Sequence, residues 1–205
     1  MINTVRLRCT IGWLGMLLPW IVLILSLAYG YGFPVSISAT YFVQTCITPF
    51  MITLGSAGLL LFSYKGYDKK DDIICSLAGL SALFVCLFPC RSFTYDYVGT
   101  FNVPTVLSGM IHNISAVVFF GLLAYNSLCL FTKTSGEITE NKKKRNIIFR
   151  VCGLGMIGSF VLLVPLTLLQ VASCIWIVEA IALMFFAISW LTKANCYPWL
   201  FCDKS

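Results

Sequence analysis

The stretch IGWLGMLLPWIVLILSLAYG, residues 11–30, contains no charged side chain. About 20 consecutive apolar residues are enough for a helix to cross the hydrocarbon core of a bilayer. The residues that follow, Tyr31, Gly32, Phe33 and Pro34, do not form the small-residue site at which a signal peptide is cleaved. We therefore interpret this stretch as a retained transmembrane helix.

Similar apolar stretches recur along the whole chain. Hydrophobic residues make up 59% of the 205 residues and charged residues only 11%, whereas soluble domains have roughly 45–50% and 25%. This composition excludes a soluble enzyme, a disordered tail and a nucleic-acid-binding module as the main interpretation. We predict an all-α integral membrane protein, with a single domain over residues 1–205 and six transmembrane helices at 11–30, 41–64, 73–90, 105–132, 147–170 and 173–192.

The basic residues give this topology a direction. All of the 14 Lys and Arg residues except Arg91 fall on one side of the predicted membrane. Cytoplasmic loops carry an excess of Lys and Arg, so both termini are predicted to be cytoplasmic, which an even number of spans also requires. The polar segment 133–146 then forms a cytoplasmic loop. Its basic block is typical of a topology signal, and it is also suited to contact anionic lipid head groups.

Two ionisable side chains lie inside the predicted spans. Glu179 stands in the sixth span without another charge nearby, and His112, the only histidine, lies in the fourth. Both spans enter from the outer side, and a helix rises ~1.5 Å per residue, so both side chains lie roughly 10 Å below the outer boundary. Ionisable groups at such depth are costly and often mark a functional site. The alternative is a polar contact that only locks two helices together.

Candidate site residues follow from this shared depth. If the protein is an enzyme, we predict His112 as the acid or base and Glu179 as its orienter or a second carboxyl, with water, Ser38 or Ser108 as nucleophile. Arg91 is expected to pair either with a phosphate or with Asp96. The predicted ligand-binding residues come from the outer loops and the outer ends of the spans: Ser38, Tyr41, Gln44, Arg91, Asp96, Ser108, Asn113, Ser115 and Trp176.

Other chemistry is weakly represented. A single histidine excludes a multi-His zinc site, and the phosphate-loop and nucleophile-elbow motifs do not occur, so we expect no metal and no cofactor. Cys86 and Cys90 end the third span, but their spacing differs from that of a redox pair, which makes thiol exchange a minor alternative. Cys196 and Cys202 follow the last span and are candidates for acylation.

Several stretches together resemble a bacterial family of six-helix membrane proteins of unknown function. They include Leu87-Phe-Pro89, His112 and Glu179, as well as the loop after the first span. Cys90 departs from the pattern, because the family has a small hydroxyl residue there. The topology is more remotely similar to that of DRAM-like membrane proteins, a group tied to lipid handling. The resemblance implies a multi-pass protein of the bacterial inner (cell) membrane and names no chemistry.

The sequence therefore predicts a polar pocket in the outward half of a membrane bundle. We expect this pocket to bind a lipid head group or a small amphiphile and leave open whether the protein modifies it. Membrane lipids are the expected partners, and nucleic acid is not. One alternative is a small-solute or proton-coupled transporter, with a polar path continuing through Asn126 to the cytoplasm. Another is a non-catalytic scaffold, with a tightly packed interior and Glu179 hydrogen-bonded.

Overall fold

The computed structural model describes residues 4–66, 68–134, 139–169 and 174–196, and helices dominate this part of the chain. A 3-10 turn, η1 (Ser38–Phe42), precedes α2, and a π-helical turn, η2 (Asn126–Leu130), extends α4. The loop between α3 and α4 contains a short antiparallel hairpin of β1 (Tyr97–Val98) and β2 (Val103–Pro104). The six α-helices are α1 (Thr4–Ala28), α2 (Gln44–Phe62), α3 (Lys69–Leu87), α4 (Thr105–Tyr125), α5 (Glu140–Leu168) and α6 (Cys174–Lys193).

Five of these helices are long and apolar enough to cross a membrane: α1, α2, α4 with η2, the first part of α5, and α6. The exception, α3, has 19 residues but carries Lys69, Lys70, Asp71 and Asp72 in its first turn. Large apolar side chains also cover the outside of the helices, as in a protein surrounded by acyl chains. The predicted helical membrane fold is confirmed to this extent, and the hairpin is the one strand element that the described residues add.

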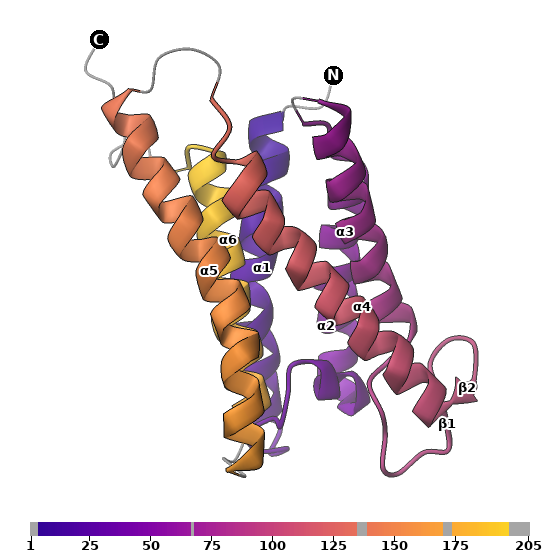
Figure 1. Cartoon of the computed structure of the whole chain (residues 1–205). Coiled ribbons are helices and arrows are strands. Elements are labelled where there is room, and N and C mark those ends of the chain that lie inside the picture. Colours follow the sequence, from indigo (N-terminus) through magenta and orange to yellow (C-terminus); the bar gives the residue numbers. More distant parts are fainter. Residues whose placement is uncertain (1–3, 67, 135–138, 170–173, 197–205) are drawn as a thin grey trace.

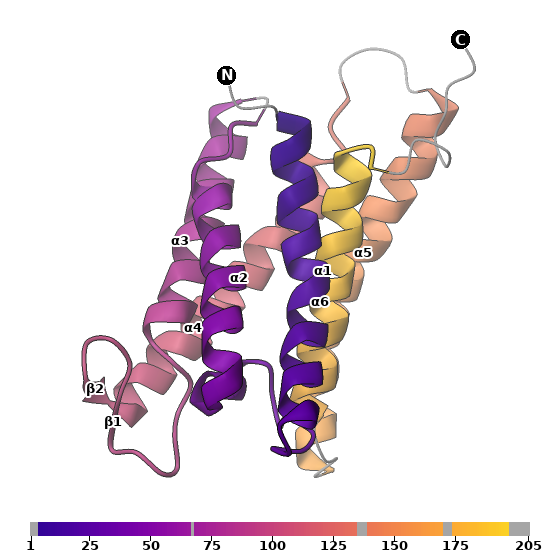
Figure 2. The same ribbon diagram turned by 180° about the vertical axis from the view of Figure 1, so that it is seen from behind.

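The helices form a ring that is closed unevenly. Going around it, α5 packs on α6, α6 on α1, α1 on α2, α2 on α3 and α3 on α4. The contact between α4 and α5, which completes the ring, is the loosest of these neighbouring pairs. In Figure 1, α4 runs obliquely across the front of the bundle toward the hairpin, whereas α5 keeps beside α6. The same row of α3, α2, α1 and α6 is seen from behind in Figure 2.

Glycines bring α1 and α6 close together. A methyl group added at Gly12 would lie 2.7 Å from Cγ of Leu191, and one at Gly15 would lie 2.5 Å from Cδ1 of Phe186. Such distances leave no room for a side chain, so small residues let the two backbones approach. Trp190 and Phe186 on α6 are among the largest fully buried side chains and fill the core next to this contact.

Several predicted boundaries differ from the structure, since α1 begins at Thr4 rather than at 11 and α3 at Lys69 rather than at 73. Helix α5 begins at Glu140 rather than at 147, because the basic block continues the helix beyond its apolar part. The predicted span 41–64 is divided, since Val43 is extended (φ −97°, ψ 115°) between η1 and α2. Position 41 therefore belongs to a separate turn. The predicted limits at 170 and 173 lie outside the described residues.

The two ends of the bundle differ in character. Helix α1 begins and α6 ends at one end, which we call the basic end because Arg8, Lys133, Lys142 and Lys193 lie there. The opposite end, with η1 and the hairpin, is called the loop end (Figure 1). At the basic end, Asp68 caps α3 by accepting from the Asp71 N–H at 3.0 Å, and Lys133 Nζ lies 2.8 Å from Asp68 Oδ2 and 2.6 Å from Asp71 Oδ1.

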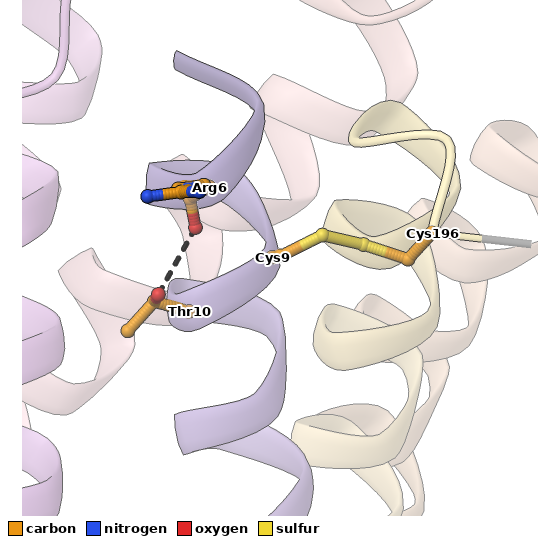
Figure 3. Close-up of a disulfide and its surroundings, with 4 residues drawn as sticks. All are labelled: Arg6, Cys9, Thr10 and Cys196. Carbon is orange, nitrogen blue, oxygen red and sulfur yellow. Dashed lines mark hydrogen bonds between the residues drawn. A yellow bond between two sulfur atoms is a disulfide. The ribbon is translucent and has the colours of Figure 1, made fainter. Parts of the chain in front are cut away.

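A disulfide joins Cys9 on α1 to Cys196, just after α6, at the same basic end (Figure 3). The Cα atoms of the two cysteines are 6.5 Å apart, within the range that a disulfide spans. A disulfide-bonded sulfur cannot carry a fatty acid, so the expectation that Cys196 is acylated is wrong in this oxidised form. Cys202 lies outside the described residues.

Candidate functional site

Three polar side chains from distant parts of the chain converge at the loop end. Ser38 Oγ lies 3.0 Å from Nε2 of His112 and 3.2 Å from Oε1 of Glu179. The histidine and the carboxylate, predicted to lie at the same depth on α4 and α6, therefore meet through the hydroxyl of Ser38 in η1. We call Ser38, His112 and Glu179 the Ser38 cluster. Its histidine is only 3% exposed.

Backbone groups fix the outer two members of the cluster. The N–H of Ile37 donates to Oε2 of Glu179 at 2.5 Å, and Nδ1 of His112 lies 2.9 Å from the carbonyl oxygen of Phe88. A carbonyl only accepts hydrogen bonds, so Nδ1 must carry a hydrogen. Neutral His112 therefore presents Nε2 as an acceptor toward Ser38. This is the tautomer in which an imidazole accepts a proton from a hydroxyl.

The loop that carries Ser38 is itself held in place by hydrogen bonds. The N–H of Trp176 donates to the carbonyl oxygen of Val35 at 3.1 Å, which ties the loop to α6. Oγ of Ser36 accepts the N–H of Ala39 at 2.8 Å and so supports the first turn of η1. Together with the bond from Ile37 to Glu179, these contacts position the Ser38 hydroxyl between the two helices.

Counting hydrogens restricts the charge of the cluster, because Ser38 has a single hydroxyl hydrogen. In one complete arrangement, protonated Glu179 donates to Ser38, which donates to neutral His112. In the other, doubly protonated His112 donates to Ser38, which donates to the Glu179 carboxylate. Both arrangements satisfy every hydrogen bond and both have no net charge. A neutral cluster suits a site within a membrane, where an unbalanced charge is costly.

A small cavity of about 60 Å³ reaches the cluster from the apolar core. Ser38 and Glu179 form its polar wall. Its volume corresponds to roughly two water molecules at about 30 Å³ each. The other lining residues are apolar and come from all six helices and the loop before η1: Leu18, Ile37, Phe50, Leu54, Val85, Ala116, Phe119, Phe120, Phe160 and Leu183.

A larger groove of about 360 Å³ lies between α4 and α5. Phe120 and Phe160 line both this groove and the small cavity, and their ring centroids are 4.9 Å apart. The other walls of the groove are apolar and include Val117 and Val161, each 64% exposed on the outside of the bundle. The two rings therefore stand between the lipid-facing surface and the cavity that ends at the Ser38 cluster.

Three further residues of the predicted site lie near the cluster without joining it. The ring of Tyr41 packs edge-on against Phe50, a wall of the cavity, with centroids 6.5 Å apart. Ser108 is buried, but its hydroxyl donates to the carbonyl oxygen of Pro89 at 2.7 Å. Trp176 is also buried, and its ring contacts Phe33 edge-on at 5.0 Å between centroids.

The structure does not bring the remaining predicted residues to the cluster. Gln44 and Asn113 are exposed, and Ser115 is half-buried on α4 below His112. Arg91 and Asp96 are exposed in the loop before α4, where the Arg91 guanidinium lies 5.5 Å from the Phe93 ring centroid. In the described part of the chain, Arg91 and Asp96 do not form an ion pair with each other. Polarity alone did not show which helix face each residue occupies.

Sequence reasoning did not anticipate the backbone partners of the cluster. The Ile37 N–H and the Phe88 carbonyl belong to chain segments outside the helices, so helical spacing carries no information about their direction. Leu87-Phe-Pro89 was the nearest signal, since a proline after Phe88 ends α3 close to this carbonyl. The described part of the chain contains no group of three or more His, Cys, Asp or Glu residues that could hold a metal ion.

No family model matches this chain, and comparisons with curated proteins and with solved structures also give no match. The resemblance to a bacterial six-helix family therefore stays a prediction.

Proposed function

We propose that this membrane protein binds an acyl-chain amphiphile, with the polar head at the Ser38 cluster and the tail along the groove between α4 and α5. One observation carries the proposal: an apolar cavity ends at Ser38 and Glu179 and shares Phe120 and Phe160 with a groove on the lipid-facing surface. The Ser38 hydroxyl and the Glu179 carboxyl at the polar wall of the cavity supply hydrogen-bonding groups for ester or hydroxyl oxygens. The apolar walls suit methylene chains.

The core below the cluster favours binding over transport. Between the cluster and Asn126, the inward faces of α4 and α6 carry the buried apolar residues Phe119, Leu123, Leu183 and Phe186. A carrier that moves protons or solutes needs polar groups or water at this level. The structure instead favours a site that is open toward the bilayer and closed toward the basic end.

Photolabelling tests where the tail lies. The full chain is placed in nanodiscs containing a phospholipid with a diazirine on one acyl chain, illuminated and mapped by mass spectrometry. We expect labels on the lining residues of the groove. Gly121 lines this groove and has open space around it, so Gly121→Leu fills the groove without a clash and should reduce labelling several-fold.

Gly158→Leu is the matched control for this experiment. Gly158 also has open space around it, but it does not line the groove. Equal labelling of the Gly121→Leu and Gly158→Leu proteins would reject the groove as the tail site. For the head, Ser38→Ala should weaken retention of the labelled lipid, whereas Ser108→Ala should not, because Ser108 bonds only to the Pro89 carbonyl.

The short contact between Ser38 and His112 favours acyl transfer as a second candidate function. In this reaction, Oγ of Ser38 attacks an ester carbonyl and His112 Nε2 takes the hydroxyl proton. The ester bond then breaks, and the leaving alcohol takes that proton from His112, which leaves the acyl group on Ser38. Water or another alcohol removes the acyl group in the reverse sequence. The Phe88 carbonyl keeps His112 in the required tautomer throughout.

A fluorophosphonate probe tests whether Ser38 is nucleophilic. We expect covalent labelling at Ser38, loss of labelling in His112→Ala, and unchanged labelling in Ser108→Ala. Absence of the Ser38 adduct in the folded wild-type protein would reject acyl transfer and leave the binding proposal standing.

A scaffold role is favoured by one different observation, which is that both carboxylate oxygens of Glu179 are hydrogen-bonded. In a scaffold, the cluster would only join η1, α4 and α6. The Ser38→Ala protein separates the two roles. A lower unfolding temperature with unchanged lipid retention supports the scaffold, and reduced retention in a protein that unfolds at the wild-type temperature supports the binding site.

The orientation is part of the same proposal. Six spans with both termini in the cytoplasm, in a bacterial cell membrane, would place the Ser38 cluster in the outer leaflet. The position of the basic residues at one end of the bundle supports this arrangement, whereas the Cys9–Cys196 disulfide at the same end is of a kind that is rare on the cytoplasmic side. Fusions of alkaline phosphatase and of green fluorescent protein after residue 205 test it. We expect only the fluorescent fusion to be active, and an active phosphatase fusion would reverse the orientation.

A further inference from the structure

A second and much larger pocket lies at the basic end, far from the Ser38 cluster along the bundle. Its volume is about 580 Å³, within the range of 300–1,000 Å³ that is typical of small-molecule sites. It is not used in the function proposed above. The lining residues come from α1, the segment after η2, α5, α6 and the segment after α6: Arg8, Lys133, Thr134, Lys142, Arg145, Phe149, Thr192, Lys193 and Asn195.

Five of the nine lining residues are cationic, and neutral groups hold several of them in place. Nε of Arg8 donates to the Tyr64 hydroxyl at 3.0 Å, and Nζ of Lys142 donates to the Phe131 carbonyl oxygen at 2.9 Å. Nζ of Lys193 lies 5.1 Å from the centroid of the Phe131 ring. The contacts of Arg8 and Lys142 with neutral oxygens orient these side chains and do not offset their charge, whereas Lys133 is already ion-paired with Asp68 and Asp71.

The topology rule alone does not account for this arrangement. Positive charge on the cytoplasmic side requires Lys and Arg in the loops, but it does not require them to surround a concavity. Arg8, Lys142 and Lys193 are each half-buried, so their repulsion is screened less than on an open surface. Cations brought together in this way are stabilised by an anion that binds among them.

The chemistry of the pocket indicates the class of anion. Guanidinium and ammonium groups together form strong hydrogen bonds to phosphate oxygens. The Thr192 hydroxyl adds a neutral donor to the same wall, whereas the Thr134 hydroxyl already donates to the carbonyl oxygen of Thr132. We propose that this pocket is a binding site for a phosphate-bearing anion with at least two negative charges. Such a group comes either from a soluble phosphate compound or from the head group of an anionic lipid in the adjacent leaflet.

The test uses the full chain in nanodiscs, at constant ionic strength, with two probes. In phosphatidylcholine nanodiscs, inorganic pyrophosphate is added, and its affinity is measured by calorimetry together with the unfolding temperature. In a parallel series, phosphatidic acid replaces part of the phosphatidylcholine, and the unfolding temperature is compared. Binding of pyrophosphate identifies a soluble ligand. Stabilisation by phosphatidic acid alone identifies a lipid head group.

Neighbouring lysines provide a matched pair of variants. Lys142 lines the pocket, whereas Lys144 is exposed on the same helix and does not. We expect Lys142→Gln to weaken binding of the effective probe about tenfold, as loss of one charge-assisted hydrogen bond does, and Lys144→Gln to leave it unchanged. Arg8→Gln, on another helix, is the second variant if Lys142→Gln does not fold. Equal weakening in both lysine variants, or no response to either probe, would overturn the proposal.

Discussion

The two ends of this bundle use polar groups in opposite ways. At the loop end, Ser38, His112 and Glu179 form a small hydrogen-bonded cluster with no net charge next to an apolar cavity. At the basic end, cations surround a pocket nearly ten times larger in volume. A neutral cluster can lie beside acyl chains, whereas a charged pocket has to face water or lipid head groups. The contrast gives the two proposed sites different chemistries on one fold.

The disulfide at the basic end is expected to give the largest effect on the free energy of unfolding. Cys9 and Cys196 close a loop with a sequence separation of 187, so the cross-link stabilises the folded chain by at most about 5 kcal/mol through the lost entropy of the unfolded chain. Cys9→Ser should therefore lower the free energy of unfolding of the oxidised protein, measured by denaturant titration. With a reductant present, the difference from wild type should vanish.

The same variant sharpens the comparison between the two ends. Lipid labelling at the groove should not change in the Cys9→Ser protein, because the Ser38 cluster lies at the other end of the bundle (Figure 1). A parallel loss of labelling would mean that the two ends do not act separately.

Glu179 is expected to give the next largest effect. In Glu179→Ala, the Ile37 N–H and the Ser38 hydroxyl lose an acceptor, which should cost about 1–3 kcal/mol of unfolding free energy. In Glu179→Gln, the side-chain oxygen still accepts from Ile37 and the amide donates to Ser38, as protonated Glu179 would. We expect this variant to unfold close to wild type.

The pair of Glu179 variants also tests which of the two protonation arrangements of Glu179 and His112 the cluster adopts. Glutamine can mimic only the arrangement in which Glu179 is protonated and His112 is neutral. Equal destabilisation by alanine and by glutamine would show that the folded protein needs the carboxylate form and a charged histidine. Denaturant titration of both proteins in the same nanodiscs measures the difference.

The smallest effect is expected at Asp68, which lies outside the membrane-spanning helices at the basic end. The hydrogen bond from Lys133 is the main cause that lowers the pKa of Asp68 to about 2, from 3.8. The partner responds in the opposite direction, because Asp68 and Asp71 raise the pKa of Lys133. Since the carboxyl pKa is lowered in the folded state, this contact stabilises the protein above about pH 4 and is lost as pH falls toward 2.

Lys133→Met removes the main cause of this shift. The pKa of Asp68, followed by carboxyl carbon NMR, should return toward 3.8, and the variant should lose less stability than wild type on acidification. An unchanged low pKa would show that the N-cap bond to Asp71 holds the carboxylate by itself.

The sequence predicts the helices, and it predicts that His112 and Glu179 lie at one level of the bundle, where both contact Ser38. Long uncharged stretches have few alternatives to a membrane helix, and a fixed rise per residue relates His112 to Glu179. The same rules do not give helix limits in water, so the seven extra residues at the start of α5 were not expected. They also give no loop conformation, so the central place of Ser38 depends on backbone contacts that only the fold reveals.

The features at the basic end were the least predictable. Counting Lys and Arg residues gives the side of the membrane, but it does not show that Arg8, Lys142 and Lys193 face one concavity. Pairing of cysteines is equally hidden, because ten cysteines allow many combinations and the partners lie at opposite ends of the chain. The cationic pocket and the disulfide both depend on contacts between segments that are distant in the sequence.

The contact between α4 and α5 is the loosest of the neighbouring helix pairs, so the ring of helices would open most easily at this seam. These two helices are consecutive, and the π-helical turn η2 extends α4 toward the basic end. Turns of this kind often occur at bends in helices. Widening the seam at the loop end would therefore part Phe120 from Phe160 while the other five helix pairs stay packed. An amphiphile could then slide in sideways from the bilayer, without its tail ever crossing water.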